Sequence, residues 1–338
     1  MSAKIMILGY GPIGRAIARQ LSDEGREVFV AQRREPANLP SGARFRACDA
    51  LDRANLTAAL QGHDVLICTI GLAYDAAIWE RDWPRLMTNM LAACEANGAR
   101  LVFVDDLYMH GPQRGPLHEN TPLDAPGRKG RVRAAITRQW QAASAVKTTA
   151  LRVPDFYGPG VTLSVLGQEA IGRLAAGRTA QLGIAPDEQH AFAYAPDVAK
   201  AAILLADARE DAYGRTWIMP CAPERTPREV IGMAAAALGV KPRLLALPGW
   251  LQKLMGSFVP FLREWNETSY QHDRPFLVDG SSFERYFGFR PMPLERGIAA
   301  TAASFLKSLK SLPDDGLAQP QGSLQQRAGR VDHKQSGP

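Results

Sequence analysis

The sequence predicts an α/β fold: a doubly wound parallel sheet with helices on both faces and a smaller region on its C-terminal side. Two observations lead to this prediction. Through residues 1–160, apolar segments of strand length alternate with amphipathic segments of helix length, which is the order that crossover connections in a parallel sheet produce. The first apolar segment runs directly into three closely spaced glycines and then into a helical pattern.

These glycines follow the spacing Gly-x-Gly-x-x-Gly, and each has a separate physical role. Gly9 permits the tight turn after the strand at 4–8, and Gly11 has no Cβ, so a phosphate can approach the backbone. Gly14 lets the helix pack close to the sheet. The free N–H groups and the positive end of the helix dipole would then face a diphosphate. This context predicts a Rossmann-like dinucleotide-binding turn, with a purely structural glycine turn as the alternative.

The second predicted strand, at 27–34, indicates which dinucleotide to expect. A site selective for NAD carries an Asp or Glu near the end of this strand, where it binds the ribose 2′-hydroxyl. Here Gln32, Arg33 and Arg34 stand at that place, and the donor fork of arginine suits a 2′-phosphate. NADP is therefore favoured over NAD, with a solvated basic loop as the alternative role for one of the two arginines.

The following segments continue the alternation. Helices are predicted at 12–24, 85–97 and 130–145, a further helix ends near residue 60, and strands are predicted at 43–47, 63–69, 100–104 and 147–153. Ligands of a parallel sheet bind beyond the carboxyl ends of its strands. The residues expected to contact the cofactor follow those ends: Gly9, Gly11, Pro12, Ile13, Gly14, Arg33, Arg34, Asp49, Ala50, Thr69, Ile70, Gly71, Pro154, Asp155 and Phe156.

The chain divides into three predicted parts. Residues 1–160 form an NAD(P)-binding region that 186–220 complete, and 161–310 form mostly a smaller substrate-binding region. Helices in this second half are predicted at 167–176, 196–208, 227–238 and 294–309. Residues 311–338 are rich in Gln, Gly, Pro and Ser and are predicted to be a disordered tail.

The composition limits the class of protein. Hydrophobic residues make up 46% and charged residues 22% of the 338 positions, with a formal net charge of +6, as in a globular protein with a large core. Basic residues are scattered, which argues against nucleic-acid binding. The four cysteines show no metal or redox spacing, so no metal is expected. Without a membrane-length apolar stretch or a signal-peptide pattern, we expect a cytoplasmic protein that does not bind a membrane.

Four later blocks carry a family resemblance. They are Leu-Arg-Val-Pro-Asp-Phe-Tyr-Gly-Pro-Gly at 151–160, Phe-Ala-Tyr-Ala-Pro-Asp-Val-Ala at 192–199, the segments 213–220 and 226–229, and Phe-Gly-Phe-Arg-Pro at 287–291. In this order they resemble the extended short-chain dehydrogenase/reductase superfamily, in the NAD-dependent epimerase/dehydratase family. The resemblance implies an NAD(P)-binding N-terminal region, a smaller C-terminal substrate region and often a homodimer.

This chain departs from the family pattern at the residues that carry the family's chemistry. One residue, Tyr10, separates the first two glycines where the family usually has two. The position of the family's catalytic Ser, five residues before Gly111, holds Asp106. The family's Tyr-x-x-x-Lys pair aligns with Lys129 and Arg133. The resemblance therefore identifies an atypical member, to which the family's tyrosinate mechanism does not transfer directly.

The replaced positions supply the candidate catalytic residues. A hydride transfer to a carbonyl needs a proton donor near the developing alkoxide. Lys129 can supply that proton if it is buried, its alternative being an exposed loop lysine. Tyr108 is a second candidate donor, and Asp106 can orient the substrate or bind a ribose hydroxyl. Arg133 can contact the nicotinamide ribose by its charge and reach.

The substrate is expected to lie against aromatic residues and one histidine. The named candidates are Trp79, Tyr157 and His190, with further aromatic surface at 258–276. Ordinary core aromatics and a histidine with satisfied hydrogen bonds are the alternatives. Residues 249–265 have some features of a helix lying on a membrane. Pro260 interrupts the pattern, which favours a lid or core role.

These patterns together predict an NADP-dependent oxidoreductase or epimerase-type enzyme acting on a small carbonyl, hydroxyl or sugar-nucleotide substrate. Two alternatives remain open. One is an NAD(P)-binding sensor or regulator that keeps the fold without catalysis, which the replaced Ser and Tyr favour. The other is a non-redox lyase or isomerase that uses the cofactor only transiently.

Overall fold

A computed structural model describes residues 3–310, and within them the main sheet has seven strands. Their order is β10-β6-β5-β4-β1-β2-β3, and all neighbours are parallel. The sheet strands are β1 (Ile5–Leu8), β2 (Val28–Gln32), β3 (Ala43–Ala47), β4 (Val65–Cys68), β5 (Arg100–Asp105), β6 (Thr148–Arg152) and β10 (Thr216–Ile218). The chain builds outward from β1 to β3 and then from β4 to β10, so the strand order reverses between β1 and β4, where such sheets bind ligands.

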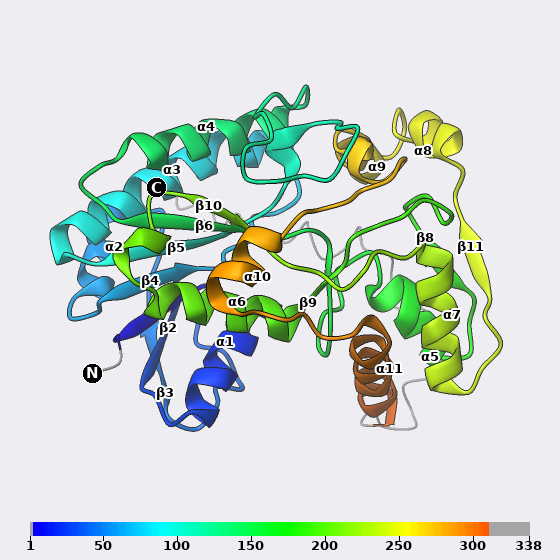
Figure 1. The fold of residues 1–338 in the computed structure, drawn as a ribbon, viewed down its shortest axis with the longest axis horizontal. Coiled ribbons are helices and arrows are strands. Elements are labelled where there is room, and N and C mark those ends of the chain that lie inside the picture. Colours follow the sequence, from blue (N-terminus) through cyan, green and yellow to red (C-terminus); the bar gives the residue numbers. More distant parts are fainter. Residues whose placement is uncertain (1–2, 311–338) are drawn as a thin grey trace, which may run out of the picture.

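Helices cover both faces of the sheet (Figure 1). On one face, α1 packs on α6, and on the other α2, α3 and α4 pack side by side. The helices are α1 (Pro12–Asp23), α2 (Arg53–Leu60), α3 (Ala76–Asn97), α4 (Arg128–Ala142) and α6 (Ala195–Asp207). The predicted doubly wound α/β fold is confirmed.

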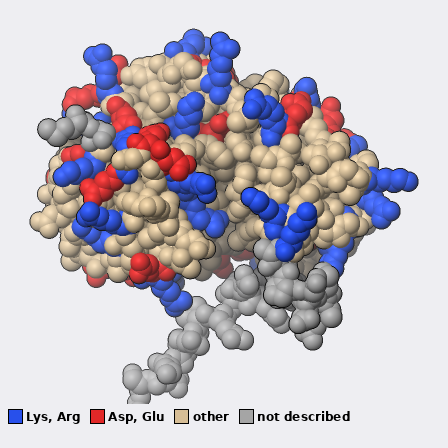
Figure 2. Space-filling model, turned by 90° about the horizontal axis from the view of Figure 1, so that it is seen from below, with Lys and Arg blue, Asp and Glu red and all other residues tan. Residues whose placement is uncertain are grey.

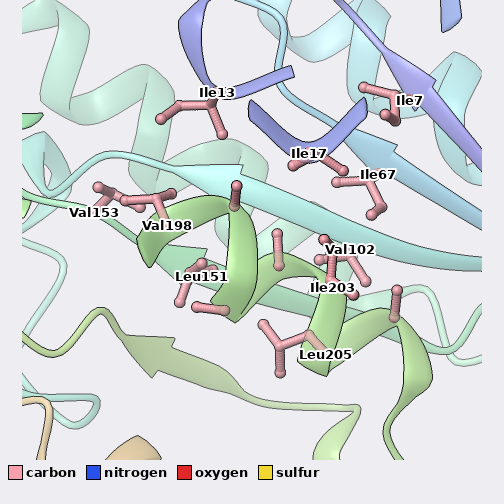
Figure 3. Packing of buried hydrophobic residues seen from close by; sticks show 14 of the residues in the cluster. Ile7, Ile13, Ile17, Ile67, Val102, Leu151, Val153, Val198, Ile203 and Leu205 are labelled. Atoms are coloured by element: carbon pink, nitrogen blue, oxygen red, sulfur yellow. The ribbon is translucent and has the colours of Figure 1, made fainter. Parts of the chain in front are cut away.

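The core of the first face consists of aliphatic side chains from the sheet and from α1 and α6 (Figure 3). Ile7, Val102 and Leu151 point from three strands toward the same layer in which Ile17 of α1 and Ile203 of α6 lie. The strands are buried on both faces, which explains why the sequence shows them as short continuous apolar runs rather than alternating ones.

The C-terminal side holds a further, separate apolar cluster around α7 and α11. Its two small sheets are parallel pairs, β7 (Phe156–Tyr157) with β9 (Ala193–Tyr194) and β8 (Ala180–Leu182) with β11 (Leu244–Ala246). The helices are α5 (Arg173–Ala175), α7 (Pro227–Leu238), α8 (Gly249–Met255), α9 (Pro260–Asn266), α10 (Ser281–Phe287) and α11 (Leu294–Lys310). Short turns of 3-10 or π type lie at Tyr108–His110, Gly167–Gly172, Glu210–Ala212 and Ser269–Gln271.

Two expectations from the sequence differ from the structure. The helix expected at 85–97 is α3, which begins at Ala76 and contains Pro84. The carboxylate of Asp75 caps its first turn, and the buried Trp79 and Trp83 hold the turns before the proline. The helices α8, α9 and α10 were not expected individually, since each has only seven residues.

Other expectations are not decided by the fold. The division at residue 160 into a cofactor region and a substrate region stays a prediction. The predicted disordered tail at 311–338 lies outside the described residues. No helix within 3–310 is long and apolar enough to cross a membrane. On the face shown in Figure 2, Lys and Arg side chains are spread among Asp and Glu side chains.

We predict that the contact of α1 with the sheet and α6 contributes strongly to stability. Replacing the fully buried Ile17 by Ala removes methylene groups and leaves a cavity between helix and sheet. We expect Ile17→Ala to lower the free energy of unfolding by about 3 kcal/mol, measured by denaturant titration. The matched control is Arg19→Ala on the same helix, whose side chain is 79% exposed and which should change stability little. Equal losses in the two variants would contradict the packing assignment.

Candidate functional site

The turn between β1 and α1 lies at the carboxyl edge of the sheet and has the shape of a phosphate cradle. Gly9 has a φ of +100°, and a Cβ on Gly14 would lie 2.2 Å from the Gly9 carbonyl oxygen, so both positions require glycine. A Cβ on Gly11 would meet nothing within 4 Å, which leaves open space over the backbone. No side chain caps the start of α1, and Pro12 occupies its first turn. The residues present therefore fit the diphosphate of a dinucleotide.

Neighbouring strand ends support this turn. The hydroxyl of Thr69, just after β4, donates to the Gly9 carbonyl oxygen at 2.9 Å. Ile70 lies so close that a Cβ on Gly9 would be 3.1 Å from its amide nitrogen. Thr69 and Ile70 thus pack closely against Gly9 at the switch point between β1 and β4. Gly11 and Gly71 are exposed to solvent on the other side of the turn.

The end of β2 carries two exposed arginines. Arg33 and Arg34 form no ion pair or hydrogen bond through their guanidinium groups among residues 3–310. The side-chain amide of Gln32 donates to the Arg34 carbonyl oxygen at 2.7 Å and stabilises the turn from Gln32 to Arg34. Next to them, Asp49 accepts from the Leu51 amide at 3.0 Å. Two cations without partners among residues 3–310 therefore stand at the end of β2.

At the carboxyl end of β5, two aspartates share one arginine. Nη1 of Arg133 donates to Oδ1 of Asp105 at 2.9 Å, and its Nε lies 2.7 Å from Oδ2 of Asp106. The guanidinium stacks on Trp83, its carbon 3.9 Å from the ring centroid. The other oxygen of Asp106 accepts the Tyr108 amide at 3.0 Å. Burial raises the pKa of Asp106 to about 7, although Arg133 opposes the shift.

Lys129, at the start of α4, is fully buried and its ammonium is already paired. Its Nζ donates to the Glu264 carboxylate and lies 3.3 Å from Oε2 of Glu267. Both glutamates belong to residues 260–276, which we call the strap, and in Figure 1 α9 of the strap lies near the segment that leads into α4. The ammonium also lies 4.5 Å from the ring centroid of Tyr74. Lys129 is therefore not the exposed loop lysine of the alternative interpretation, and it binds the strap.

Two tyrosines lie between the strap and β5. The Tyr74 hydroxyl is 2.6 Å from Oγ1 of Thr268, and the ring centroids of Tyr74 and Tyr108 are 6.3 Å apart. The Tyr270 hydroxyl donates to the Tyr108 carbonyl oxygen at 2.7 Å. Burial raises the pKa of Tyr108 well above its usual value. Its hydroxyl therefore stays protonated at neutral pH and can donate a hydrogen bond.

After β6, Asp155 contacts two histidines. Nε2 of His190 donates to Oδ2 of Asp155 at 2.8 Å, and Nε2 of His272 lies 3.7 Å from the same oxygen. Burial alone would raise the pKa of Asp155, but the hydrogen bond from His190 and the charges of His190 and His272 together hold this pKa below its usual value. His272 stacks on Trp265 with ring centroids 4.2 Å apart, and burial lowers the pKa of its imidazole to about 4.

The remaining predicted substrate residues are buried. Trp79 donates its indole N–H to a backbone carbonyl in the turn before α3. Tyr157 lies in the C-terminal apolar cluster, and its hydroxyl lies so close to Gly297 that a Cβ there would be 2.4 Å away. Pro154 and Phe156 flank Asp155 just beyond β6. Contact of these residues with ligands stays a prediction.

Four residues of this region were not singled out from the sequence. Tyr74, Glu264, Glu267 and His272 come from the turn before α3 and from the strap. Trp265 was expected as part of the aromatic surface at 258–276. The glutamates have no local signal because their partner, Lys129, lies more than 130 positions away in the chain.

A hollow of about 740 Å³ lies elsewhere on the molecule. It is lined by Asp64, Gly98, Lys147 and Asp207 among others, of which Asp64 and Lys147 directly precede β4 and β6. This is the edge opposite the glycine turn, so we do not assign the site to it. Within the described part of the chain, no three His, Cys, Asp or Glu side chains are grouped as metal ligands.

Comparisons with known proteins agree with this fold. Residues 5–218 match the sequence profile of the NAD dependent epimerase/dehydratase family. A comparison with curated proteins gives no match. Similar solved structures include the Bordetella bronchiseptica enzyme WbmH in complex with NAD+, at 18% identity and a TM-score of 0.70, with 90% of this chain and 98% of that chain covered.

Two other solved structures are similar over nearly their whole length. DesIV, a dTDP-glucose 4,6-dehydratase from Streptomyces venezuelae, has 20% identity and a TM-score of 0.73, covering 91% of this chain and 98% of its own. The UDP-glucose 4-epimerase of Thermus thermophilus has 19% identity and a TM-score of 0.69, covering 89% and 98%. At these identities the likeness establishes the fold alone.

We predict that Lys129 stabilises the strap rather than a reacting group. Lys129→Met leaves the carboxylates of Glu264 and Glu267, each 17% exposed, facing a buried apolar side chain. We expect the free energy of unfolding to fall by about 3–5 kcal/mol, measured by denaturant titration.

Two further variants test this assignment. Adding Glu264→Gln and Glu267→Gln to Lys129→Met should recover much of the loss, because no unpaired carboxylate then remains. Lys147→Met breaks an exposed ion pair with Glu210 and should leave stability nearly unchanged. An unchanged stability of Lys129→Met would contradict the role assigned to the pair.

Proposed function

Since the chain belongs to the NAD-dependent epimerase/dehydratase family and is therefore an enzyme, we propose that it oxidises or reduces the hydroxyl- or carbonyl-bearing carbon of a small molecule with NADP. The observation that carries the proposal is the position of Asp106. It stands at the carboxyl end of β5, on the same edge of the sheet as the glycine turn, with a side chain 23% exposed and a pKa near neutrality. Such a group can take or give a proton at physiological pH.

NADP is the proposed cofactor because of the end of β2. The relatives described above contain NAD, whereas this chain offers Arg33 and Arg34 there without carboxylate partners among the described residues. Guanidinium groups bind phosphate through charge-assisted hydrogen bonds. The glycine turn and the start of α1 would hold the diphosphate. When bound, the nicotinamide ring accepts or supplies a hydride.

In the proposed reaction, residues of this chain remove and return the proton of the substrate hydroxyl group. In the oxidative direction, the substrate C–H bond breaks with loss of a hydride, and the Asp106 carboxylate removes the hydroxyl proton as the carbonyl forms. In the reductive direction, the protonated Asp106 returns that proton to the oxygen. Tyr108, whose hydroxyl stays protonated, donates a hydrogen bond to the same oxygen.

Arg133 and Lys129 have positioning roles in this proposal. Arg133 fixes the carboxylates of Asp105 and Asp106 and is itself held against Trp83. Lys129 binds the strap, so its ammonium is engaged away from proton transfer. The homodimer and the cytoplasmic location expected from the sequence stay predictions.

We predict that the two arginines after β2 select NADPH over NADH. Arg33→Ala and Arg34→Ala each remove a charged donor from the proposed 2′-phosphate site. We expect the Kd for NADPH to rise about tenfold in at least one of them, with the Kd for NADH unchanged, measured by fluorescence titration. Arg19→Ala, on the exposed face of α1, is the control and should change neither value. Equal losses for both cofactors would refute the assignment.

We predict that Asp106 controls the pH dependence of the reaction. Oxidation needs its carboxylate, so kcat/KM for oxidation should rise with pH through about 7, whereas reduction should fall over the same range. Asp106→Asn should remove this inflection and lower kcat by about 10²–10⁴-fold.

The same variant separates catalysis from binding. NADPH affinity should be retained in Asp106→Asn, because the carboxamide keeps the size of the side chain and lies apart from the glycine turn. The control, Asp187→Asn, replaces an exposed carboxylate paired with Arg228 and should keep the inflection. An Asp106→Asn enzyme with the original pH profile would exclude Asp106 as the proton-transferring group.

A further inference from the structure

An exposed apolar patch lies on α8, on α9 and on the turn between them. Of the eight large hydrophobic side chains that are exposed within residues 3–310, five fall between positions 245 and 261. Phe258 is 81% exposed, Trp250 is 69% exposed and Leu254 is 56% exposed. Single exposed hydrophobic residues are common, but a concentration of them marks an interaction surface. The patch, as we use the word here, consists of Trp250, Leu254, Phe258 and Phe261.

Hydrogen bonds fix the backbone under the patch. The side-chain amide of Asn266 donates to the Gln252 carbonyl oxygen of α8 at 3.1 Å. The side-chain amide of Gln252 donates to the Leu247 carbonyl oxygen at 2.7 Å, and Gln252 is buried on one side of α8. Trp250 and Leu254, four positions apart, share the opposite, outward side of this helix. Figure 1 shows α8 at the margin of the molecule, where it packs against α9.

The charged side chains of this segment are all positive. Residues 239–263 contain no Asp or Glu, and the basic residues among them are exposed: Lys241, Arg243, Lys253 and Arg263. Their only ion pair within residues 3–310 joins Lys253 to Asp273 across 3.7 Å, and Asp273 also pairs with Arg274 at 2.8 Å. The next carboxylate along the chain, that of Glu264, binds the buried Lys129. Positive charge therefore accompanies the exposed aromatic and aliphatic side chains.

This combination fits an anionic lipid surface better than it fits other partners. In a symmetric pair of copies the same basic side chains would face each other, and like charges repel. Residues 311–338 contain three Asp, three Lys or Arg and no aromatic residue, so they offer the patch neither net negative charge nor a ring. Trp and Phe with neighbouring Lys or Arg are the side chains that enter the headgroup region of an anionic bilayer.

We propose that the α8–α9 segment docks onto an anionic lipid bilayer, with Trp250, Leu254 and Phe258 entering the headgroup region. The four basic residues would lie at the level of the lipid phosphates. The contact is peripheral, since no helix within 3–310 is long and apolar enough to cross a membrane. This proposal replaces the sequence-based expectation that the protein does not bind a membrane, and it does not depend on the proposed reaction.

Co-sedimentation with lipid vesicles tests the docking. We expect the full-length protein to bind vesicles containing about 30% phosphatidylserine at least about tenfold more strongly than vesicles of phosphatidylcholine alone, because each basic residue is attracted to the anionic surface. Raising the salt concentration from about 0.1 M to about 0.5 M should weaken this binding.

Two variants test the role of the patch. The double variant Trp250→Ser/Phe258→Ser should bind the anionic vesicles at least about tenfold more weakly, because it removes apolar surface that would leave water. The control is Leu163→Ser, which replaces a side chain 82% exposed outside the patch and should bind as the original protein does. Denaturant titration checks that both variants are folded, as expected for changes at exposed positions.

Tryptophan fluorescence tests whether the patch inserts. Brominated phosphatidylcholine quenches indole rings that reach the acyl chains, so we expect vesicles that contain it with phosphatidylserine to quench the original protein. Trp250→Phe should keep the vesicle affinity and lose this quenching. Without vesicles, acrylamide should quench Trp250, because its side chain is exposed.

Other results would overturn the proposal. Absence of binding to the anionic vesicles, or equal losses in Leu163→Ser and the double variant, would exclude a lipid-docking patch. Vesicle binding without quenching of Trp250 would show adsorption by charge alone. Protection of Trp250 from acrylamide would show that the patch is already covered. Sedimentation velocity would then assign the cover to a second copy, if a dimer dissociates in the double variant, or to residues 311–338, if the protein is a monomer.

Discussion

A buried ammonium ties two distant parts of this chain together. Lys129 lies in the first turn of α4, which packs on the main sheet. Glu264 and Glu267 belong to the strap on the C-terminal side. Removing an ammonium from water costs several kcal/mol unless carboxylates compensate it. The strap must therefore lie against α4 whenever Lys129 is buried. This contact brings His272, on which Trp265 stacks, next to Asp155.

The parallel topology brings the arginines after β2 and the aspartates after β5 and β6 to the same edge of the sheet. The carboxyl ends of β1, β2, β5 and β6 lie on the same side of the sheet. At β2, Arg33 and Arg34 are exposed and unpaired within residues 3–310, which suits an anionic cofactor. At β5 and β6, the accessible charges are carboxylates.

Sequence reasoning worked best where structure follows from neighbouring residues. The strand at 100–104 was located to within one residue, because a short apolar run between turns is typical of a buried strand. The strand at 43–47 was also located, although none of its residues is buried. The start of α3 was misplaced by nine residues, since Pro84 normally ends a helix and tertiary packing of Trp79 and Trp83 overrode it. The seven-residue helices α8 and α9 were missed because short helices depend on tertiary contacts.

The sequence by itself determined the glycine turn and the alternation of strands and helices, and its resemblance to the family predicts that Asp106, Lys129 and Arg133 replace the family's Ser, Tyr and Lys. These features are local, and each depends on residue type and short spacing. Only the tertiary structure decided that Lys129 binds the strap and that Asp155 contacts His190 and His272. Those partners are 35 or more positions apart, and burial, which sets their charge and availability, arises only when the chain is folded.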